Sequence, residues 1–231
     1  MYRERASTVP GAVVWEKTGV GHDAVLPDGC MDLIWMGGQV VVAGPDTSPH
    51  VSLFGGYSNQ KDSREDSERF VGLRFPPGAL PRLLGVPATE LVDARAPLAE
   101  VMPGTDALAD EIATADAGSA LESFARRQTM YTPDARTRTI VQALQAGLPV
   151  STVASQVNLS SRQLHRWSLR NFGYGAKTLA RILRFQAALN LASVEPCDAA
   201  VAARAGYADQ AHLIRETTDL AGCTFAALAR A

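Results

Sequence analysis

The feature that most constrains the fold is a pattern of two short helices separated by a tight turn, which occurs twice in the C-terminal part of the chain. The first occurrence is VSTVASQVNLSSRQLHRWSLRNFG (150–173), and the second is DAAVAARAGYADQAHLIRETTDLAG (198–222). Both contain apolar residues at helical spacing, interrupted by residues suited to turns. The sequence therefore predicts two helix-turn-helix units. Helices are expected near 135–146, 150–157, 161–172, 176–193, 198–204 and 209–221.

In the first unit, Ser160 and Gln163 form a capping-box pattern that predicts a helix start at Ser161. The expected buried face of this helix consists of Leu164, Trp167 and Phe172. The opposite face carries Arg162, His165, Arg166 and Arg170. An arginine offers a planar fork that fits guanine edges or phosphates, so this face suits DNA recognition. A solvated basic helix face has the same composition, and this segment alone does not decide between the two.

The second unit has Gly206 at its turn and Asp209 as the N-cap of the following helix. That helix directs Leu213 toward the core. Its other side presents Gln210, Ala211, Ile214 and Arg215. The helix between the units has about 18 residues and would span about 27 Å, close to the ~34 Å between successive major-groove faces. One chain could thus place two recognition helices in adjacent grooves.

The charges divide unevenly along the chain, although the whole carries a net charge of only −2. Before Pro133 there are 11 Lys and Arg against 18 Asp and Glu, a net of −7, and from Pro133 onward there are 11 against 6, a net of +5. A basic C-terminal part beside an acidic remainder suits one module that touches a polyanion and one that does not.

The N-terminal half has a different pattern. Short apolar runs between Val13 and Phe75, broken by Gly, Pro, Asp and Asn, predict short strands, and 55–68 is expected to be an exposed loop. From Pro77 the spacing becomes helical. We therefore expect an α+β protein with a β-rich regulatory domain that ends in helices (1–132) and an all-α DNA-binding domain (133–231).

The C-terminal part, from about Asp134 to Ala231, resembles the AraC/XylS family. The match rests on LSSRQLHRWSLRNFG, LARILRFQAALNLA and AARAGYADQAHLIRE, in the family's order and separation. The resemblance implies base-edge contacts from Arg162, His165, Arg166, Gln210, Ala211, Ile214 and Arg215. It implies phosphate contacts from Arg170, Ser161 and the helix N-termini, whereas His212 is interpreted as a packing or phosphate residue.

The sequence departs from the family pattern after the second recognition helix. The segment TTDLAGCTFAALARA has small residues at Thr217, Thr218 and Ala221, where the family usually has larger ones. This departure predicts a less firmly packed second unit. Ile214 cannot hydrogen-bond a base edge and could only touch a thymine methyl group. We therefore expect the first unit to dominate specificity.

The N-terminal region resembles the cupin-like regulatory domains that precede such DNA-binding domains in many bacterial regulators. The strings HDAVLPDGCMDLIW, VVVAGPDT and FVGLRFPPGALPRLLGVPATELVD carry this resemblance over about Met1 to Val101. It implies a sensor role without naming a ligand. The candidate lining residues of an apolar pocket are Trp15, Trp35, Phe54 and Phe75, and the alternative is that they form the core.

No metal site or cofactor is expected. His22, Cys30 and His50, with Asp28 and Asp32, are potential ligands, but the HxH…E…H spacing of metal-binding cupins is absent. The three cysteines are far apart and suggest neither a disulfide framework nor a zinc site. The chain also lacks a Ser/His/Asp pattern and a phosphate-binding glycine loop, so no enzymatic activity is predicted.

These observations predict a cytoplasmic bacterial transcription regulator, since no apolar run is long enough to span a bilayer and the N-terminus is unlike a signal peptide. Its partners would be double-stranded DNA and an unidentified small-molecule effector, with no membrane. RNA polymerase and a second copy of the chain stay open as further partners. The helices over about 106–131 are the expected coupling or dimerisation element.

Two alternatives from other classes stay open. One is an enzyme or small-molecule binder built on the N-terminal domain, with the helical domain as a passive DNA anchor. The other is a DNA-repair protein with a similar module, which would require a reactive cysteine. No cation near Cys30 in the sequence suggests activation of its thiolate.

Overall fold

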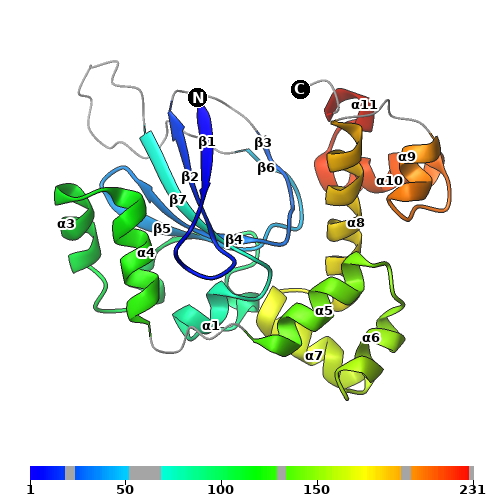
Figure 1. Cartoon of the computed structure of the whole chain (residues 1–231), viewed down its shortest axis with the longest axis horizontal. Helices are drawn as coiled ribbons and strands as arrows, with labels where there is room; N and C mark the ends of the chain where they lie inside the picture. Colours follow the sequence, from blue (N-terminus) through cyan, green and yellow to red (C-terminus); the bar gives the residue numbers. More distant parts are fainter. Residues whose placement is uncertain (19–23, 52–68, 129–133, 194–198, 229–231) are drawn as a thin grey trace.

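The computed structural model describes residues 1–18, 24–51, 69–128, 134–193 and 199–228. An antiparallel sheet with helices beside it forms the N-terminal part, and helices alone form the C-terminal part (Figure 1). The predicted α+β arrangement is confirmed. The expected loop over 55–68 and the candidate pocket residue Phe54 lie outside the described residues.

The main sheet has six strands in the order β1-β2-β7-β4-β5-β8, with every neighbouring pair antiparallel. A two-stranded ribbon pairs β3 with β6. The strands are β1 (Tyr2–Ala6), β2 (Val13–Thr18), β3 (Ala24–Val25), β4 (Met31–Met36), β5 (Gln39–Ala43), β6 (His50–Val51), β7 (Arg69–Phe75) and β8 (Arg95–Pro97). The sequence did not predict β1, because this edge strand is exposed along its whole length and has no apolar alternation.

One face of the sheet forms the core of the N-terminal domain. Successive strand residues point to opposite faces, so Val14, Leu33 and Leu73 pack on this side, against α3 (Ala107–Thr114) and α4 (Ala117–Arg127). The shorter elements before these helices are α1 (Leu80–Leu84), the 3₁₀-helix η1 (Ala88–Glu90) and α2 (Leu98–Val101). Both α3 and α4 lie on the side of the sheet away from the C-terminal helices (Figure 1).

A buried carboxylate fastens α4 to the start of the chain. Glu122 accepts hydrogen bonds from Arg5 Nη2 at 2.9 Å, from Ser7 Oγ at 2.7 Å and from the backbone N–H of Thr8 at 2.6 Å. Burial opposes the charged form, but these donors outweigh it and lower the pKa of Glu122 to about 2. The ionised carboxylate therefore holds the turn between β1 and β2 on the helix.

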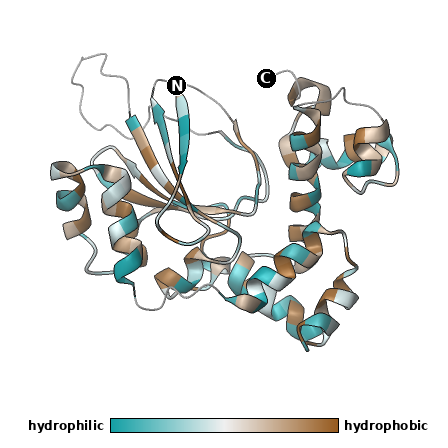
Figure 2. Ribbon diagram, viewed as in Figure 1, coloured by the Kyte–Doolittle hydropathy of each residue, from teal (hydrophilic) through white to brown (hydrophobic). Residues whose placement is uncertain are grey.

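The C-terminal part is built around α8 (Ala176–Ala192), a helix of 17 residues. The other helices are α5 (Ala135–Gln145), α6 (Val150–Gln156), α7 (Ser161–Phe172), α9 (Ala199–Arg204), α10 (Gln210–Ala221) and α11 (Phe225–Leu228). The first six expected helices agree with these bounds to within one residue, whereas the short α11 was not predicted. Hydrophobic and hydrophilic bands alternate along α5, α7 and α8 (Figure 2). Among the described residues, no helix is long and apolar enough to cross a membrane.

The two parts of the chain share a packed interface. Leu26, from the segment before β4, lies against the core of the C-terminal helices. The Gln186 side chain of α8 donates a hydrogen bond of 2.7 Å to the backbone oxygen of Pro27. A third contact brings Gly78 against Phe172 and Thr137, where a Cβ atom would lie 2.8 and 2.9 Å from their side chains. The interface therefore leaves no space for a side chain at position 78.

Gly78 provides a direct test of this docking. Its φ of +80° disfavours any L side chain, and Gly85 has nearly the same constraint, a φ of +75°, with nothing within 4 Å of its missing Cβ. Gly85→Ala should therefore cost about 1 kcal/mol of unfolding free energy from backbone strain alone. Gly78→Ala should cost roughly 1–3 kcal/mol more because its methyl group overlaps Phe172. Urea denaturation checks this difference, and equal losses would show that the interface is not packed as described.

Candidate nucleic-acid interface

The first unit consists of α6 and α7, joined by a turn in which Asn158 adopts a left-handed φ of 55°. The capping box is formed as predicted. Ser160 Oγ accepts from the backbone N–H of Gln163 at 3.2 Å, and Gln163 Oε1 accepts from the backbone N–H of Ser160 at 2.8 Å. These reciprocal bonds fix the start of α7 at Ser161.

Two faces of α7 have separate environments. Leu164 and Phe172 are buried, and Trp167 packs edge-on against Phe172 with 5.4 Å between ring centroids. The residues that the sequence assigned to DNA are all exposed: Ser161, Arg162, His165, Arg166 and Arg170. Among the described residues, none of these three arginines has a carboxylate partner. Their guanidinium groups are therefore available to an external acceptor.

His165 occupies the border of this exposed face. A Cβ atom at Gly175, the residue that precedes α8, would lie 2.9 Å from His165 Nδ1. The imidazole is therefore close to the turn between α7 and α8.

The second unit consists of α9 and α10, with Gly206 in the turn at a φ of +86°. Asp209 caps α10 by accepting a hydrogen bond of 2.6 Å from the backbone N–H of His212. Leu213 is fully buried as predicted. The four residues assigned to base edges in this unit are exposed: Gln210, Ala211, Ile214 and Arg215.

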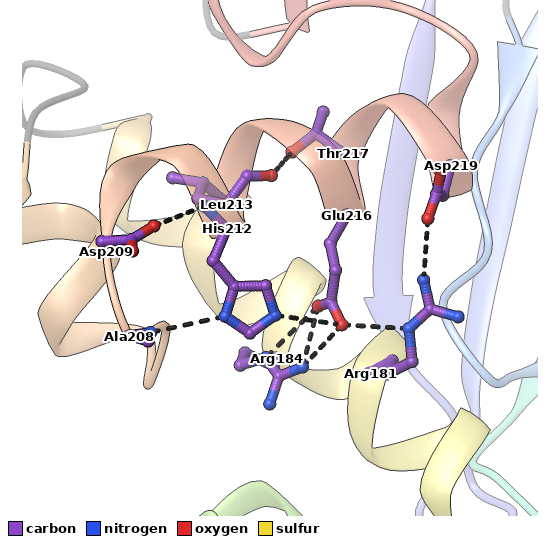
Figure 3. Close-up of polar contacts among 9 residues, drawn as sticks. All are labelled: Arg181, Arg184, Ala208, Asp209, His212, Leu213, Glu216, Thr217 and Asp219. Carbon is purple, nitrogen blue, oxygen red and sulfur yellow. Dashed lines mark hydrogen bonds and ion pairs between the residues drawn. The ribbon is translucent and has the colours of Figure 1, made fainter.

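A cluster of charged residues joins α10 to α8 (Figure 3). Glu216 lies at its centre, with a side chain only 8% exposed. Its carboxylate accepts from Arg184 Nη2 at 2.7 Å and from Arg181 Nε at 2.9 Å. Burial favours the neutral carboxyl, but the hydrogen bonds from Arg184 and Arg181 outweigh burial and lower the pKa of Glu216 below its ordinary value. The sequence analysis did not predict this cluster, because Arg184 and Arg181 are 32 and 35 residues away from Glu216 along the chain.

His212 has an internal position beside the same cluster. Its Nδ1 accepts from the backbone N–H of Ala208 at 3.4 Å, and its Nε2 lies 3.6 Å from Glu216 Oε1. The ring also meets Tyr207 edge-on, and Arg184 lies over that tyrosine ring at 4.8 Å from its centroid. Of the two predicted roles of His212, these contacts agree with packing.

The core of the second unit is small. Its buried residues are Ala188, Ala202, Ala205, Tyr207, Leu213 and Phe225. Thr217 is fully buried, and its hydroxyl donates a hydrogen bond of 2.8 Å to the backbone oxygen of Leu213 within α10. The ion pairs of Glu216 therefore supply a polar attachment between α10 and α8, where apolar contact area is limited.

The three candidate pocket residues that the structure describes, Trp15, Trp35 and Phe75, do not all lie on one face of the sheet. Phe75 is fully buried in the core on the helix-covered face of the sheet, and Trp35 packs on the same side. Trp15 lies on the opposite face, which we call the Trp15 face, with Phe70, Ile34 and Met36. Phe75 is therefore a core residue, which is the alternative that the sequence left open.

The Trp15 face also contains a buried polar cluster that the sequence did not predict. Trp15 Nε1 donates to Asp32 at 2.6 Å, and Arg74 Nε lies 3.4 Å from Asp32 and 3.9 Å from Asp28. Burial raises the pKa of Asp32, although Arg74 and the indole N–H favour its charged form. Asp32 and Arg74 are paired across β4 and β7. Strand alternation alone does not predict this pairing, because it also depends on the register of the two strands.

Cys30 is not activated by this environment. Burial, together with the nearby carboxyl groups of Asp28 and Asp32, raises the pKa of the Cys30 thiol well above its ordinary value. The predominant form near neutral pH is therefore the thiol, which is the poor nucleophile. In the part of the chain that the structure describes, no group of three His, Cys, Asp or Glu residues could hold a metal ion.

Comparison with known families agrees with this geometry. Residues 153–231 match a family described as a helix-turn-helix domain, which is of the AraC type. This match covers α7, α8 and α10. The C-terminal part of the chain therefore contains an AraC-type helix-turn-helix domain. Residues 12–97 match a domain of unknown function (DUF6597). No curated protein matches this chain.

Several solved structures are similar to this chain at low sequence identity. A probable AraC family transcriptional regulator from Rhodopseudomonas palustris is 21% identical, with a TM-score of 0.37, over 42% of this chain and 96% of that one. Apo ToxT from Vibrio cholerae is 10% identical, with a TM-score of 0.48, over 97% and 99% of the two chains. ToxT bound to (E)-4-(8-methylnaphthalen-1-yl)but-3-enoic acid is 10% identical, with a TM-score of 0.49, over 99% and 98%.

The role of Glu216 can be tested against a matched acidic residue. Asp219, also on α10, pairs with Arg181 at 3.3 Å but is 68% exposed. Glu216→Gln should lower the free energy of unfolding by about 1–2 kcal/mol, because two partly buried guanidinium groups lose their counter-charge. Asp219→Asn should cost less than about 0.5 kcal/mol, since exposed ion pairs contribute little. Chemical denaturation measures both. Similar losses would contradict a central role for Glu216.

Proposed function

We propose that the regulator reads DNA through α7 and α10, which enter adjacent major grooves, and that a small molecule bound by the N-terminal domain changes its affinity for DNA. In the first unit, Arg162 and Arg166 contact base edges, with His165 beside them. Arg170 and Ser161 contact the phosphate backbone. In the second unit, the base contacts come from Gln210, Ala211, Ile214 and Arg215.

The availability of the α7 arginines is the observation that carries this proposal. A guanidinium group satisfied by an internal carboxylate has fewer donors left for a base or a phosphate, as with Arg181 and Arg184 on α8. Arg162, Arg166 and Arg170 are exposed on a helix whose opposite face is buried. Such an anchored helix loses little conformational entropy on binding, which supports direct contact of its charged groups with bases.

The second unit has a different chemical character. Ile214 is an apolar side chain on the outer face of α10 and is 46% exposed. A thymine methyl group in the major groove would cover this side chain, and Gln210 at the start of α10 offers an amide suited to adenine. We therefore assign the second unit to A·T base pairs, with the first unit contributing more of the specificity because it carries more arginines.

The Trp15 face is the proposed location of the effector. It combines aromatic and aliphatic side chains with the polar cluster of Asp32 and Arg74, and such a mixture is common in small-molecule sites. Within the described residues, the buried Arg74 Nε has no hydrogen-bond partner. An effector that binds one docked arrangement of the domains better than another would shift their populations and so change DNA affinity.

The segment 26–30 would transmit this change. Asp28 faces Arg74 on the Trp15 face, while Pro27 accepts the hydrogen bond from Gln186 of α8. Leu26 packs in the C-terminal core. This placement favours the segment over α3 and α4 as the coupling element, since those helices lie on the far side of the sheet (Figure 1).

The remaining expectations follow from this function. A regulator of bacterial genes works in the cytoplasm, where the DNA lies. RNA polymerase contact and pairing with a second copy stay proposals, and α3 and α4 are free to serve the latter because they lie away from the DNA-binding helices (Figure 1).

Selection of bound duplexes from random DNA tests the proposal at fixed salt concentration. The unmodified protein should enrich a defined motif. Arg166→Ala and Arg162→Ala should each relax one part of that motif and weaken binding to it by about 1–3 kcal/mol, because a bidentate contact to guanine is lost.

Arg136→Ala is the matched control for this selection. Arg136 is an exposed arginine on α5, so its substitution removes the same charge without touching either recognition helix. It should leave the motif unchanged. If no motif is enriched, or if Arg136→Ala relaxes the same positions, the assignment of α7 to base recognition is wrong.

A further inference from the structure

A cleft lies between the two domains, apart from the Trp15 face and from the recognition helices. Its volume is about 360 Å³, within the range of about 300–1,000 Å³ that is usual for small-molecule sites. The wall from the N-terminal domain consists of Pro10, Gly11, Pro76, Pro77, Gly78, Ala79 and Arg82. The wall from the C-terminal domain consists of Asp134 and, on α5, Thr137, Arg138, Val141, Gln142 and Gln145.

The walls are stiff and mostly apolar. Three prolines, whose rings fix φ, line the N-terminal side, so few backbone torsions there are free to change. Val141 contributes an apolar surface from α5. A preformed apolar cleft loses little conformational entropy when a compact ligand enters it.

The charges of the cleft favour an anion. Its charged residues are Arg82, Asp134 and Arg138. Arg82 Nη1 lies 3.5 Å from Asp134 Oδ2, so these two charges offset each other. Asp134 is further occupied as the N-cap of α5, where it accepts from the backbone N–H of Arg136 at 3.0 Å, and by the hydroxyl of Thr137. Arg138 has no partner among the described residues and leaves one positive charge at the cleft.

We infer that this cleft is a second ligand site, which binds a compact organic anion with an apolar body against the prolines and Val141 and its carboxylate on Arg138. Because one wall comes from each domain, the anion binds only the docked arrangement. It therefore stabilises the docking of α5 on the N-terminal domain by mass action. The site does not depend on the proposed role of the Trp15 face or on contacts to DNA.

Biphenyl-4-carboxylate is a suitable probe, and biphenyl-4-carboxamide is its uncharged counterpart. Isothermal titration calorimetry with the full chain should show one saturable site for the carboxylate, with a Kd on the order of 0.1–1 mM for a ligand of this size. The carboxamide should bind at least about fivefold more weakly, because the charge-assisted hydrogen bonds to Arg138 are lost.

Three variants separate the cleft from other surfaces. Arg138→Ala should weaken carboxylate binding about fivefold or more while leaving carboxamide binding unchanged. Val141→Trp should remove binding of both probes by filling the cleft, and urea denaturation confirms that this variant is folded. Arg136→Ala, on α5 but outside the cleft lining, should bind like the unmodified protein.

The inference is overturned if the unmodified protein shows no saturable binding, or if Arg136→Ala weakens the carboxylate as much as Arg138→Ala does. DNA selection by the same variants is measured separately. If the protein enriches a DNA motif but binds neither probe, the proposed function stands and the cleft site is rejected. If it binds the probes but enriches no motif, the cleft site stands and the proposed function is rejected.

Discussion

The buried carboxylate of Glu216 is the interaction on which the arrangement of the two DNA-binding units most depends. It accepts hydrogen bonds from Arg181 and Arg184 of α8 and so joins α10 to α8. Since α8 also packs on α7, this interaction connects the two units. At 1.5 Å per residue, the 17 residues of α8 span about 26 Å. The basic residues therefore divide into two groups. Arg181 and Arg184 join α8 to α10, whereas Arg162, Arg166 and Arg170 are exposed, and we propose that they contact DNA.

The same helix also connects the DNA-binding units to the N-terminal domain. Gln186 of α8 bonds to Pro27, and Leu26 lies in the core of the helical domain, so the segment before β4 belongs to both domains. Asp28 in this segment faces the Arg74 side chain of the sheet. A change at the sheet therefore has a short physical route to α8, through packed side chains and one hydrogen bond. The interface also has a cleft, so docking itself is open to control by a ligand.

The sequence predicted the helical domain well because its signals are local. The capping box of Ser160 and Gln163, the cap at Asp209 and the glycine turns each depend on residues at most three positions apart, and all are formed. The short strands of the N-terminal domain were also predicted from a local signal, the short apolar runs broken by turn residues. The edge strand β1 was missed because its mostly polar residues contain no such run.

Contacts between distant segments could not be predicted in this way. The pairing of Arg184 with Glu216 and of Asp32 with Arg74 depends on how helices and strands come together, and the sequence alone does not contain that register. For the same reason, Trp15 and Phe75 were grouped as candidate pocket residues, although strand alternation places them on opposite faces of the sheet. The docking of Gly78 on Phe172 is likewise visible only in three dimensions.

Hydroxyl-radical footprinting of the full chain on its selected duplex is the most direct test of two recognition helices held by one rigid linker. The account predicts two protected patches on the same face of the DNA, centred about one helical turn of 10–10.5 base pairs apart. Glu216→Gln should weaken the patch of the second unit while the other persists. A single protected patch in the unmodified protein would contradict the account, because it would mean that α10 does not enter the groove.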